Sequence, residues 1–107
     1  MEYTENKILP ERALLVALDT GEYDAESSLD ELWELAKSGG AEPVATLTQK
    51  RPAPETATCV GSGMVQEIRT FCEDNATELI IFDRELTPTQ IRNLEKETDV
   101  RVVDRTM

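Results

Sequence analysis

The chain has 107 residues, of which 39% are hydrophobic, enough for one domain with a single modest core. Its 22 acidic residues outnumber 11 basic ones, and the net charge of −11 argues against a free-standing nucleic-acid-binding domain, which normally presents a basic surface to phosphate. Histidine is absent, which excludes imidazole as a catalytic base or metal ligand, and two cysteines are too few for a disulfide framework.

The first third of the chain predicts a tail, a strand and a helix. Residues 1–11 are polar and are expected to form a flexible N-terminal tail. Residues 12–18 form the first strand, which is wholly apolar from its second residue onward. A helix is expected over residues 25–38, because apolar side chains recur there at i, i+3, i+4 and i+7 before a pair of glycines. Asp24, or Ser27 if the helix begins later, can cap its start.

The middle of the chain predicts a strand, a long loop and a second helix. Residues 43–50 mix apolar and polar side chains, a pattern typical of a strand that is only partly covered. Residues 51–60 are expected to form a loop with two prolines. Cys59 lies in this loop and is a candidate for an exposed thiol. The second helix begins near Gly61. Its expected inward-facing residues are Met64, Val65, Ile68, Phe71 and Cys72.

The last quarter predicts a strand, a helix and a strand. Residues 79–82 are a short apolar run that ends at an aspartate. Thr87 then supplies a capping hydroxyl, and Pro88 occupies the first helical position, where a missing N–H costs nothing. Residues 100–103, with three valines, form the final strand.

The predicted order is β-α-β-α-β-α-β, which indicates an α/β fold with a parallel sheet and right-handed crossovers. The first and third strands are continuously apolar, as expected for central strands covered on both faces, whereas the second and fourth are mixed, as expected for edges. We therefore predict a four-stranded parallel sheet in the order 2-1-3-4, flanked by three helices, in a single domain over residues 12–107.

Charged side chains of both signs follow the predicted strands. The carboxyl ends of parallel strands meet at one edge of the sheet, where α/β proteins bind their ligands, so we predict a partner-binding edge there. The candidate residues are Lys50, Arg51, Asp83, Arg84, Asp104 and Arg105. The alternative is that these loops are polar because loops are exposed, and that the aspartates and arginines neutralise one another.

A short glycine-containing turn precedes the second helix. Backbone N–H groups at Gly61, Ser62 and Gly63, together with the helix dipole, form a weak candidate site for an anion. The alternative is a simple tight turn. The P-loop pattern G-x-x-x-x-G-K-(S/T) occurs nowhere in the chain.

Several phrases of the sequence match a known family. They are FDRELTPTQIRNLEK at 82–96, VRVVDRT at 100–106 and GSGMVQEI at 61–68. Together with the apolar opening strand and the leucine-rich acidic helix, they give a resemblance over residues 12–107 to the N-terminal domain of the HflX family of ribosome-associated GTPases. The family usually has lysine after the G-x-G, where this chain has Met64.

The resemblance implies a ribosome-contacting and regulatory domain of a longer GTPase that binds the large ribosomal subunit, through its rRNA, and acts in ribosome splitting and rescue. A helical segment and a G domain should follow, and the G domain would bind GTP and Mg²⁺ and contact this domain. In this chain itself we expect no catalytic residue, no metal site and no cofactor.

Two other functions stay open. A receiver-like phosphoacceptor domain is suggested by Asp83 after the third strand and Asp19 after the first, but the second acid beside Asp19 and a fifth strand with its lysine are missing. A small nucleotide-binding domain would use the same edge, without a phosphate-binding fingerprint.

The ends and hydropathy of the chain bear on its location. No signal peptide precedes the first strand, and no apolar run approaches the ~20 residues of a membrane span. We therefore expect a cytoplasmic protein with neither a membrane nor DNA as its partner.

Overall fold

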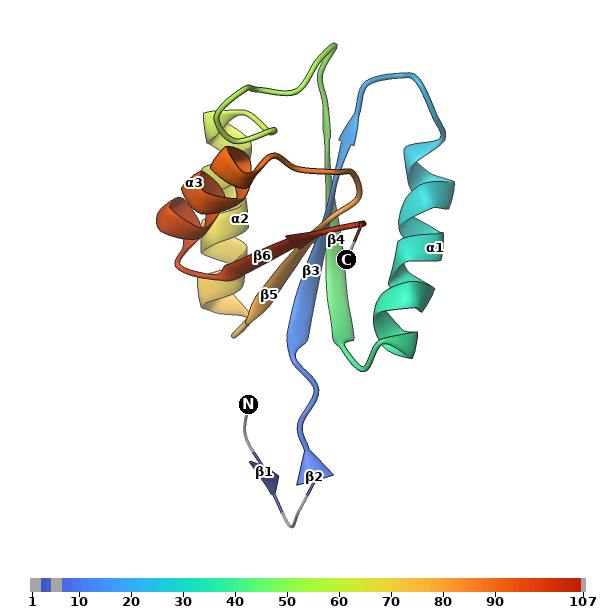
Figure 1. Cartoon of the computed structure of the whole chain (residues 1–107), viewed down its shortest axis with the longest axis vertical. Coiled ribbons are helices and arrows are strands. Elements are labelled where there is room, and N and C mark those ends of the chain that lie inside the picture. Colours follow the sequence, from blue (N-terminus) through green and yellow to red (C-terminus); the bar gives the residue numbers. More distant parts are fainter. Residues whose placement is uncertain (1–2, 5–6, 107) are drawn as a thin grey trace.

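A four-stranded parallel sheet forms the centre of the computed structural model, which describes residues 3–4 and 7–106, with side chains from residue 9 onward (Figure 1). In chain order the strands are β3 (Arg12–Asp19), β4 (Glu42–Lys50), β5 (Leu79–Phe82) and β6 (Arg101–Asp104). They lie in the order β4-β3-β5-β6, which confirms the predicted order 2-1-3-4.

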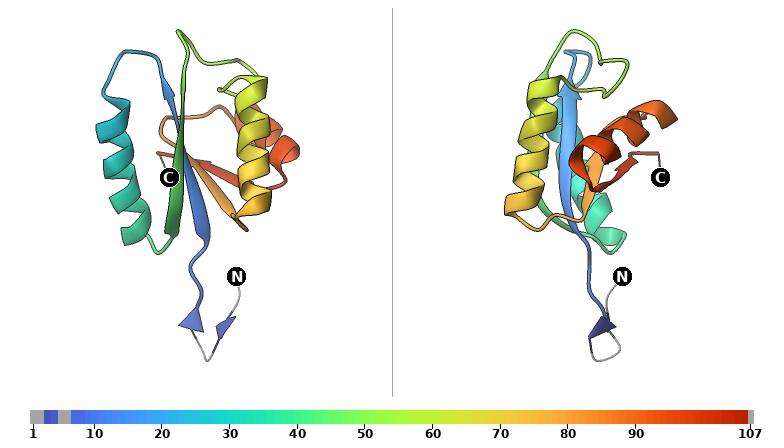
Figure 2. Two further views of the ribbon diagram at one scale, coloured as in Figure 1. Left: turned by 180° about the vertical axis from the view of Figure 1, so that it is seen from behind. Right: turned by 90° about the vertical axis from the view of Figure 1, so that its left-hand side faces the viewer.

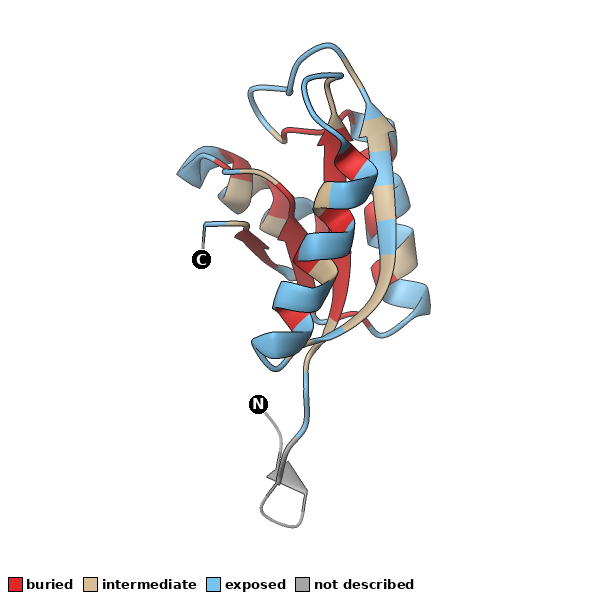
Figure 3. Ribbon diagram, turned by 90° about the vertical axis from the view of Figure 1, so that its right-hand side faces the viewer, coloured by how far each residue is buried: buried red, intermediate tan, exposed pale blue. Residues whose placement is uncertain are grey.

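Burial explains why the two apolar strands lie in the middle. All side chains from Ala13 to Leu18 in β3 are fully buried, and β5 is buried throughout, whereas β4 alternates between half-buried and exposed residues (Figure 3). A strand that is apolar on both faces must be covered on both, and only an interior position in the sheet provides this. The mixed polarity of β4 suits an edge.

Three helices cover the two faces of the sheet. They are α1 (Ala25–Ser38), α2 (Ser62–Asp74) and α3 (Pro88–Thr98). Helix α1 covers one face, and α2 and α3 cover the other (Figures 1 and 2). Alternate residues of the central strands therefore enter two separate cores. Leu14 and Phe82 belong to the core under α2 and α3, whereas Leu15 and Ile81 belong to the core under α1.

Local capping fixes the starts of α1 and α3. The Asp24 carboxylate accepts a hydrogen bond from the N–H of Ser27 at 3.2 Å, so of the two caps that the sequence allowed, Asp24 is the one used. At α3, Thr87 and Gln90 form a reciprocal capping box, in which each side chain accepts a hydrogen bond from the backbone N–H of the other residue, at 3.1 and 2.9 Å. The predicted proline follows at the first helical position.

Two short strands precede the sheet. β1 (Tyr3–Thr4) and β2 (Lys7–Ile8) pair antiparallel, which the sequence pattern did not predict. The flexibility expected for residues 1–11 stays a prediction; residues 1–2 and 5–6, like Met107, lie outside the described part of the chain. Among the residues that the structure describes, no helix combines the length and apolar character needed to cross a bilayer.

Candidate functional site

The predicted binding edge forms where the four parallel strands end. We define the carboxyl edge as the residues that close each strand or follow it: 19–21 after β3, 50–52 after β4, 83–84 after β5 and 104–106 after β6. Because β3 and β5 are neighbours whose chains continue to opposite faces of the sheet, the edge contains the switch point at which α/β domains commonly bind ligands.

Two of the predicted candidates, Asp83 and Arg105, bind each other. The Asp83 side chain is fully buried, and its Oδ1 accepts a hydrogen bond from Arg105 Nη1. The same guanidinium donates to the hydroxyl of Ser28 at 2.9 Å and forms an ion pair with Glu31 at 2.6 Å. Arg105 therefore joins the ends of β5 and β6 to α1. Sequence reasoning missed Ser28 and Glu31, whose only signal was their spacing of three residues on one helical face.

Asp104, the second acidic candidate, anchors a loop. It is buried, and its carboxylate accepts hydrogen bonds from the N–H of Leu86 at 2.7 Å and from the N–H and hydroxyl of Thr106 at 3.0 and 2.6 Å. Burial alone would raise the pKa of Asp104, but these three hydrogen bonds favour the ionised form and lower it below its ordinary value. Its carboxylate is thus committed to holding the β5–α3 loop against the end of β6.

This lowered pKa makes the domain sensitive to acid. A carboxylate with a depressed folded-state pKa stabilises the fold fully above the unfolded pKa of about 4, and that contribution is lost as the pH falls through the folded value. We expect Asp104→Asn to lower the free energy of unfolding by about 1–3 kcal/mol near neutral pH and to reduce the loss on acidification. Urea unfolding at about pH 7 and pH 3 measures both. Equal pH dependence of variant and wild type would contradict this role.

The candidate anion turn lies beside Arg51. The N–H of Gly61 donates to Gln49 Oε1 at 2.9 Å, and a Cβ built on Gly61 would come within 2.7 Å of Arg51 Nη1, so this glycine allows the arginine to approach the start of α2. The guanidinium also forms an ion pair with Glu55. Ser62 and Gly63 are exposed, and anion binding there stays a prediction.

Met64, at the position where the resemblance to the HflX family implies a lysine, faces inward. It is buried in the core between α2 and the sheet. A side chain in this position packs against its neighbours and does not extend toward a phosphate at the helix start.

The remaining cations of the carboxyl edge, Lys50 and Arg84, differ in exposure. Lys50 is exposed, and within the described part of the chain it forms no ion pair. Arg84 is half-buried, and its Nη1 has no hydrogen-bond partner among the described residues. It lies close enough to Tyr23 and Cys59 to act on both: burial raises both pKa values, and the arginine opposes the shift. The sequence did not single out Tyr23, whose hydroxyl donates to the carbonyl of Leu18 at 3.2 Å.

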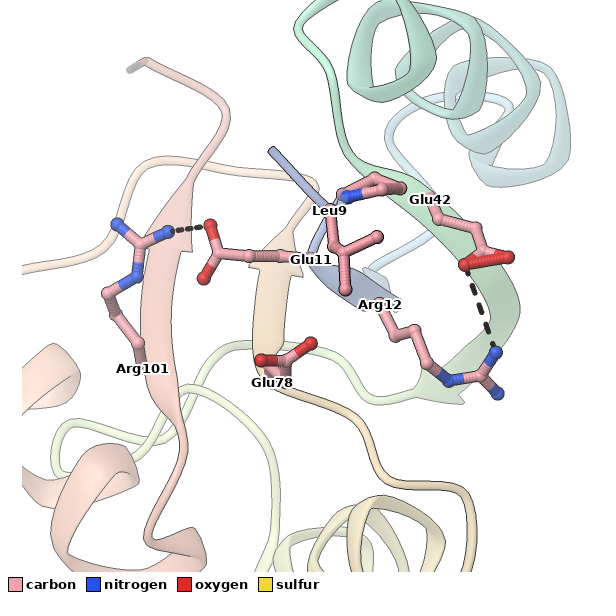
Figure 4. A pocket seen from close by; sticks show the side chains of 7 residues that line it. Leu9, Glu11, Arg12, Glu42, Glu78 and Arg101 are labelled. Carbon is pink, nitrogen blue, oxygen red and sulfur yellow. Dashed lines mark hydrogen bonds and ion pairs between the residues drawn. The ribbon is translucent and has the colours of Figure 1, made fainter. Parts of the chain in front are cut away.

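The hollows at the two ends of the sheet differ in character. At the carboxyl edge, an open depression of about 450 Å³ is lined by residues 19–21 and 50–52. At the amino ends of the strands lies a cavity of about 540 Å³, where Arg12 faces Glu42 at 3.9 Å and Arg101 binds Glu11 at 2.7 Å (Figure 4). The two ion pairs hold the strand ends together, so neither arginine of this cavity is free to bind an anion.

Neither cysteine is available for surface chemistry. Cys72 packs in the core as predicted, and burial raises the pKa of its thiol to about 11. Cys59 is also buried, although its loop position left it open to exposure. The loop folds back through paired hydrogen bonds between Glu55 and Cys59, and this turns the thiol inward. In residues 3–4 and 7–106, no cluster of three or more metal-binding side chains occurs.

Comparison with known proteins identifies the domain type. Residues 26–107 match the model of a family described as GTP-binding GTPase N-terminal. The chain is 45% identical over 96 residues to the GTPase HflX of Caldanaerobacter subterraneus subsp. tengcongensis, covering 90% of this chain and 22% of that protein. It is 44% identical to GTPase HflX of Lacrimispora saccharolytica over 99% of this chain and 25% of the relative. It is 34% identical to GTPase HflX of Escherichia coli, over 90% of this chain and 22% of that protein. The chain thus spans a quarter or less of the length of these curated relatives.

Proposed function

Because the chain belongs to the GTP-binding GTPase N-terminal family, as the N-terminal domain of an HflX protein, we propose that it is a non-catalytic binding and regulatory module of a longer GTPase. The observation that carries this proposal is the state of the carboxyl edge. Its two buried carboxylates, Asp83 and Asp104, are occupied by Arg105 and by backbone and hydroxyl donors. Carboxylates used in this way hold neighbouring elements in place, which supports a contact role for the edge.

GTP and Mg²⁺ would bind elsewhere in the longer protein. The chain has no P-loop lysine or adjacent serine or threonine, the groups that hold nucleotide phosphates and magnesium in GTPases. At the turn before α2, the chain has the buried Met64 where the resemblance implies a lysine. A separate G domain, with which this module would be in contact, supplies the nucleotide chemistry.

The proposed partner is the large ribosomal subunit, contacted through rRNA during ribosome splitting or rescue in the cytoplasm, without DNA or membrane. With a net charge of −11, the domain is repelled by phosphate at long range, so any contact must be local. The exposed Lys50, with Arg51 beside it in the same depression, provides such a local cationic patch at the carboxyl edge. Arg105 is a weaker candidate than its sequence position suggested, because its guanidinium is shared among three side chains.

A pair of charge-matched variants tests this contact. In the longer GTPase, Lys50→Glu with Arg51→Glu should weaken co-sedimentation with large subunits about tenfold near 0.1 M salt, because two phosphate contacts become repulsive. Arg92→Glu with Lys96→Glu, two exposed positions on α3, changes the net charge equally and should have little effect. Equal losses in both variants would indicate a non-specific charge effect. A larger loss in the α3 variant would place the contact on the exposed side of α3 and not at the carboxyl edge.

The alternative functions fit the edge less well. A receiver-like phosphoacceptor needs an accessible aspartate, but the Asp83 side chain is fully buried and ion-paired. A nucleotide-binding domain needs groups that hold phosphate, and the turn at residues 61–63 offers only backbone N–H groups beside an arginine already paired with Glu55. Stabilisation of the isolated chain by ATP or GTP in a thermal-shift experiment would favour this second alternative.

A further inference from the structure

The outer edge of β4 is open for pairing over its middle residues, 44–49. β4 is a nine-residue strand at the end of the sheet (Figure 2). Glu42, Pro43 and Lys50 protect its two ends, but the stretch from Val44 to Gln49 contains neither a charged residue nor a proline. Natural proteins usually protect long edge strands with such residues, because unpaired backbone groups recruit other strands. The other edge is protected: β6 has only four residues, and the Glu95 side chain accepts a hydrogen bond from the N–H of Val102 at 3.0 Å.

The hydrogen-bond register determines which backbone groups of β4 point outward. The N–H of Arg51 donates to the carbonyl of Asp19 in β3. In a parallel ladder, inward and outward residues alternate, so residues 45, 47 and 49 bond to β3. The N–H and C=O groups of Thr46 and Thr48 therefore point away from the sheet. Within the described part of the chain, neither of these outward N–H groups donates a hydrogen bond.

A groove beside this open edge carries negative charge. Thr46 and Thr48 line a hollow of about 480 Å³ between β4 and α1, together with Asp19, Glu26 and Asp30. None of these three carboxylates forms an ion pair within the described part of the chain. The side chains of Ala45 and Leu47, by contrast, pack against the core on the α2 side. A strand added to β4 would thus direct every second side chain toward the carboxylates.

We propose that β4 pairs with an extended cationic polypeptide segment, which adds a fifth strand to the sheet and places alternate lysine or arginine side chains in the groove beside α1. Main-chain hydrogen bonds to Thr46 and Thr48 provide affinity, and the carboxylates select positive charge. A second copy of this chain is a poorer occupant, because two molecules of net charge −11 repel each other. The groove shares Asp19 with the carboxyl edge, but pairing along β4 does not depend on the proposed ribosome contact.

The test is a titration of the ¹⁵N-labelled chain with synthetic peptides of about eight residues, near the usual strand length. In the first peptide lysine alternates with valine, and in the second glutamate replaces lysine. A third has the lysine sequence with alternate backbone amides methylated, which removes main-chain pairing. We expect only the first peptide to shift the amide resonances of residues 44–49, and we expect higher salt to weaken its binding.

Matched variants separate the two contributions. Thr46→Pro removes an outward N–H at an edge position where proline is tolerated, and it should abolish binding, whereas Thr46→Val keeps the N–H and should bind as the wild type does. Glu26→Gln with Asp30→Asn should weaken binding about three- to tenfold, as expected for exposed ion pairs. If Thr46→Pro fails to fold, the methylated peptide still measures the main-chain contribution.

Three results would overturn the proposal. The first is that the lysine peptide leaves the β4 resonances unchanged. The second is that the glutamate peptide or the methylated peptide binds as tightly as the lysine peptide. Alternatively, ultracentrifugation of the chain alone could detect a dimer that Thr46→Pro dissociates, which would assign the edge to a second copy.

Discussion

Replacing Arg105 by alanine is expected to lower the free energy of unfolding by about 2–4 kcal/mol. The Asp83 carboxylate is fully buried, and Arg105 provides the hydrogen bond to its Oδ1, while its Oδ2 has no partner among the described residues. Removing the guanidinium leaves a buried charge without compensation, which costs more than the ion pair itself contributes. The lower part of the range reflects the partial exposure of Arg105, at which solvent can replace some of the lost interaction.

Arg101→Ala is the matched control for this prediction. Arg101 also pairs with a glutamate, Glu11, at 2.7 Å, but more than half of its side chain is exposed, so its loss should cost less than about 1 kcal/mol. Urea unfolding followed through the fluorescence of Trp33, the single tryptophan, measures both variants. If the two substitutions destabilise the domain equally, the Asp83–Arg105 pair is an ordinary surface ion pair and does not lock the ends of the strands.

Phe82→Ala should have the largest effect of a single core substitution, about 3–5 kcal/mol. Phe82 is fully buried at the end of the central strand β5, in the core that α2 and α3 cover. Truncation removes a large apolar side chain and leaves a cavity that neighbouring strands cannot close without losing their register. For a small domain with a typical stability of about 5–15 kcal/mol, this is a large fraction of the total.

Phe71, the other phenylalanine, gives the comparison. It lies on α2 and is only half-buried against the same core, so Phe71→Ala should cost about 1–2 kcal/mol. Denaturant midpoints at a constant m-value report the difference. A loss at position 71 equal to or larger than that at position 82 would show that the α2 surface, and not the central strand, dominates this core.

The residues at the end of β5 make the carboxyl edge a rigid platform. Phe82 fills the core directly beneath the end of β5, and the next residue, Asp83, ties that end to β6 and α1 through Arg105. A destabilised variant would be expected to lose partner binding indirectly. Contact experiments on this edge therefore need substitutions at exposed positions such as Lys50, which support no part of this network.

The sequence by itself determined the order of the strands and the starts of two helices. Both can be read from short stretches of consecutive residues. The unbroken apolar runs of β3 and β5 require cover on both faces, and the Thr87–Gln90 capping box closes within three residues. The family resemblance was equally readable, because it consists of local phrases in a fixed order, and the comparisons confirmed it.

Only the tertiary structure decided what the charged residues do. Arg105 binds Asp83, which is 22 positions away in the chain, and Glu31, which is 74 positions away. No local sequence pattern shows which of several acidic residues an arginine will pair with. The burial of Cys59 and the outward N–H groups of Thr46 and Thr48 likewise follow from how a loop folds back and from the register between strands. Hydrophobic periodicity is repeated and short-ranged, so a sequence displays it, whereas a single ion pair or an open strand edge depends on distances that exist only after the elements have packed.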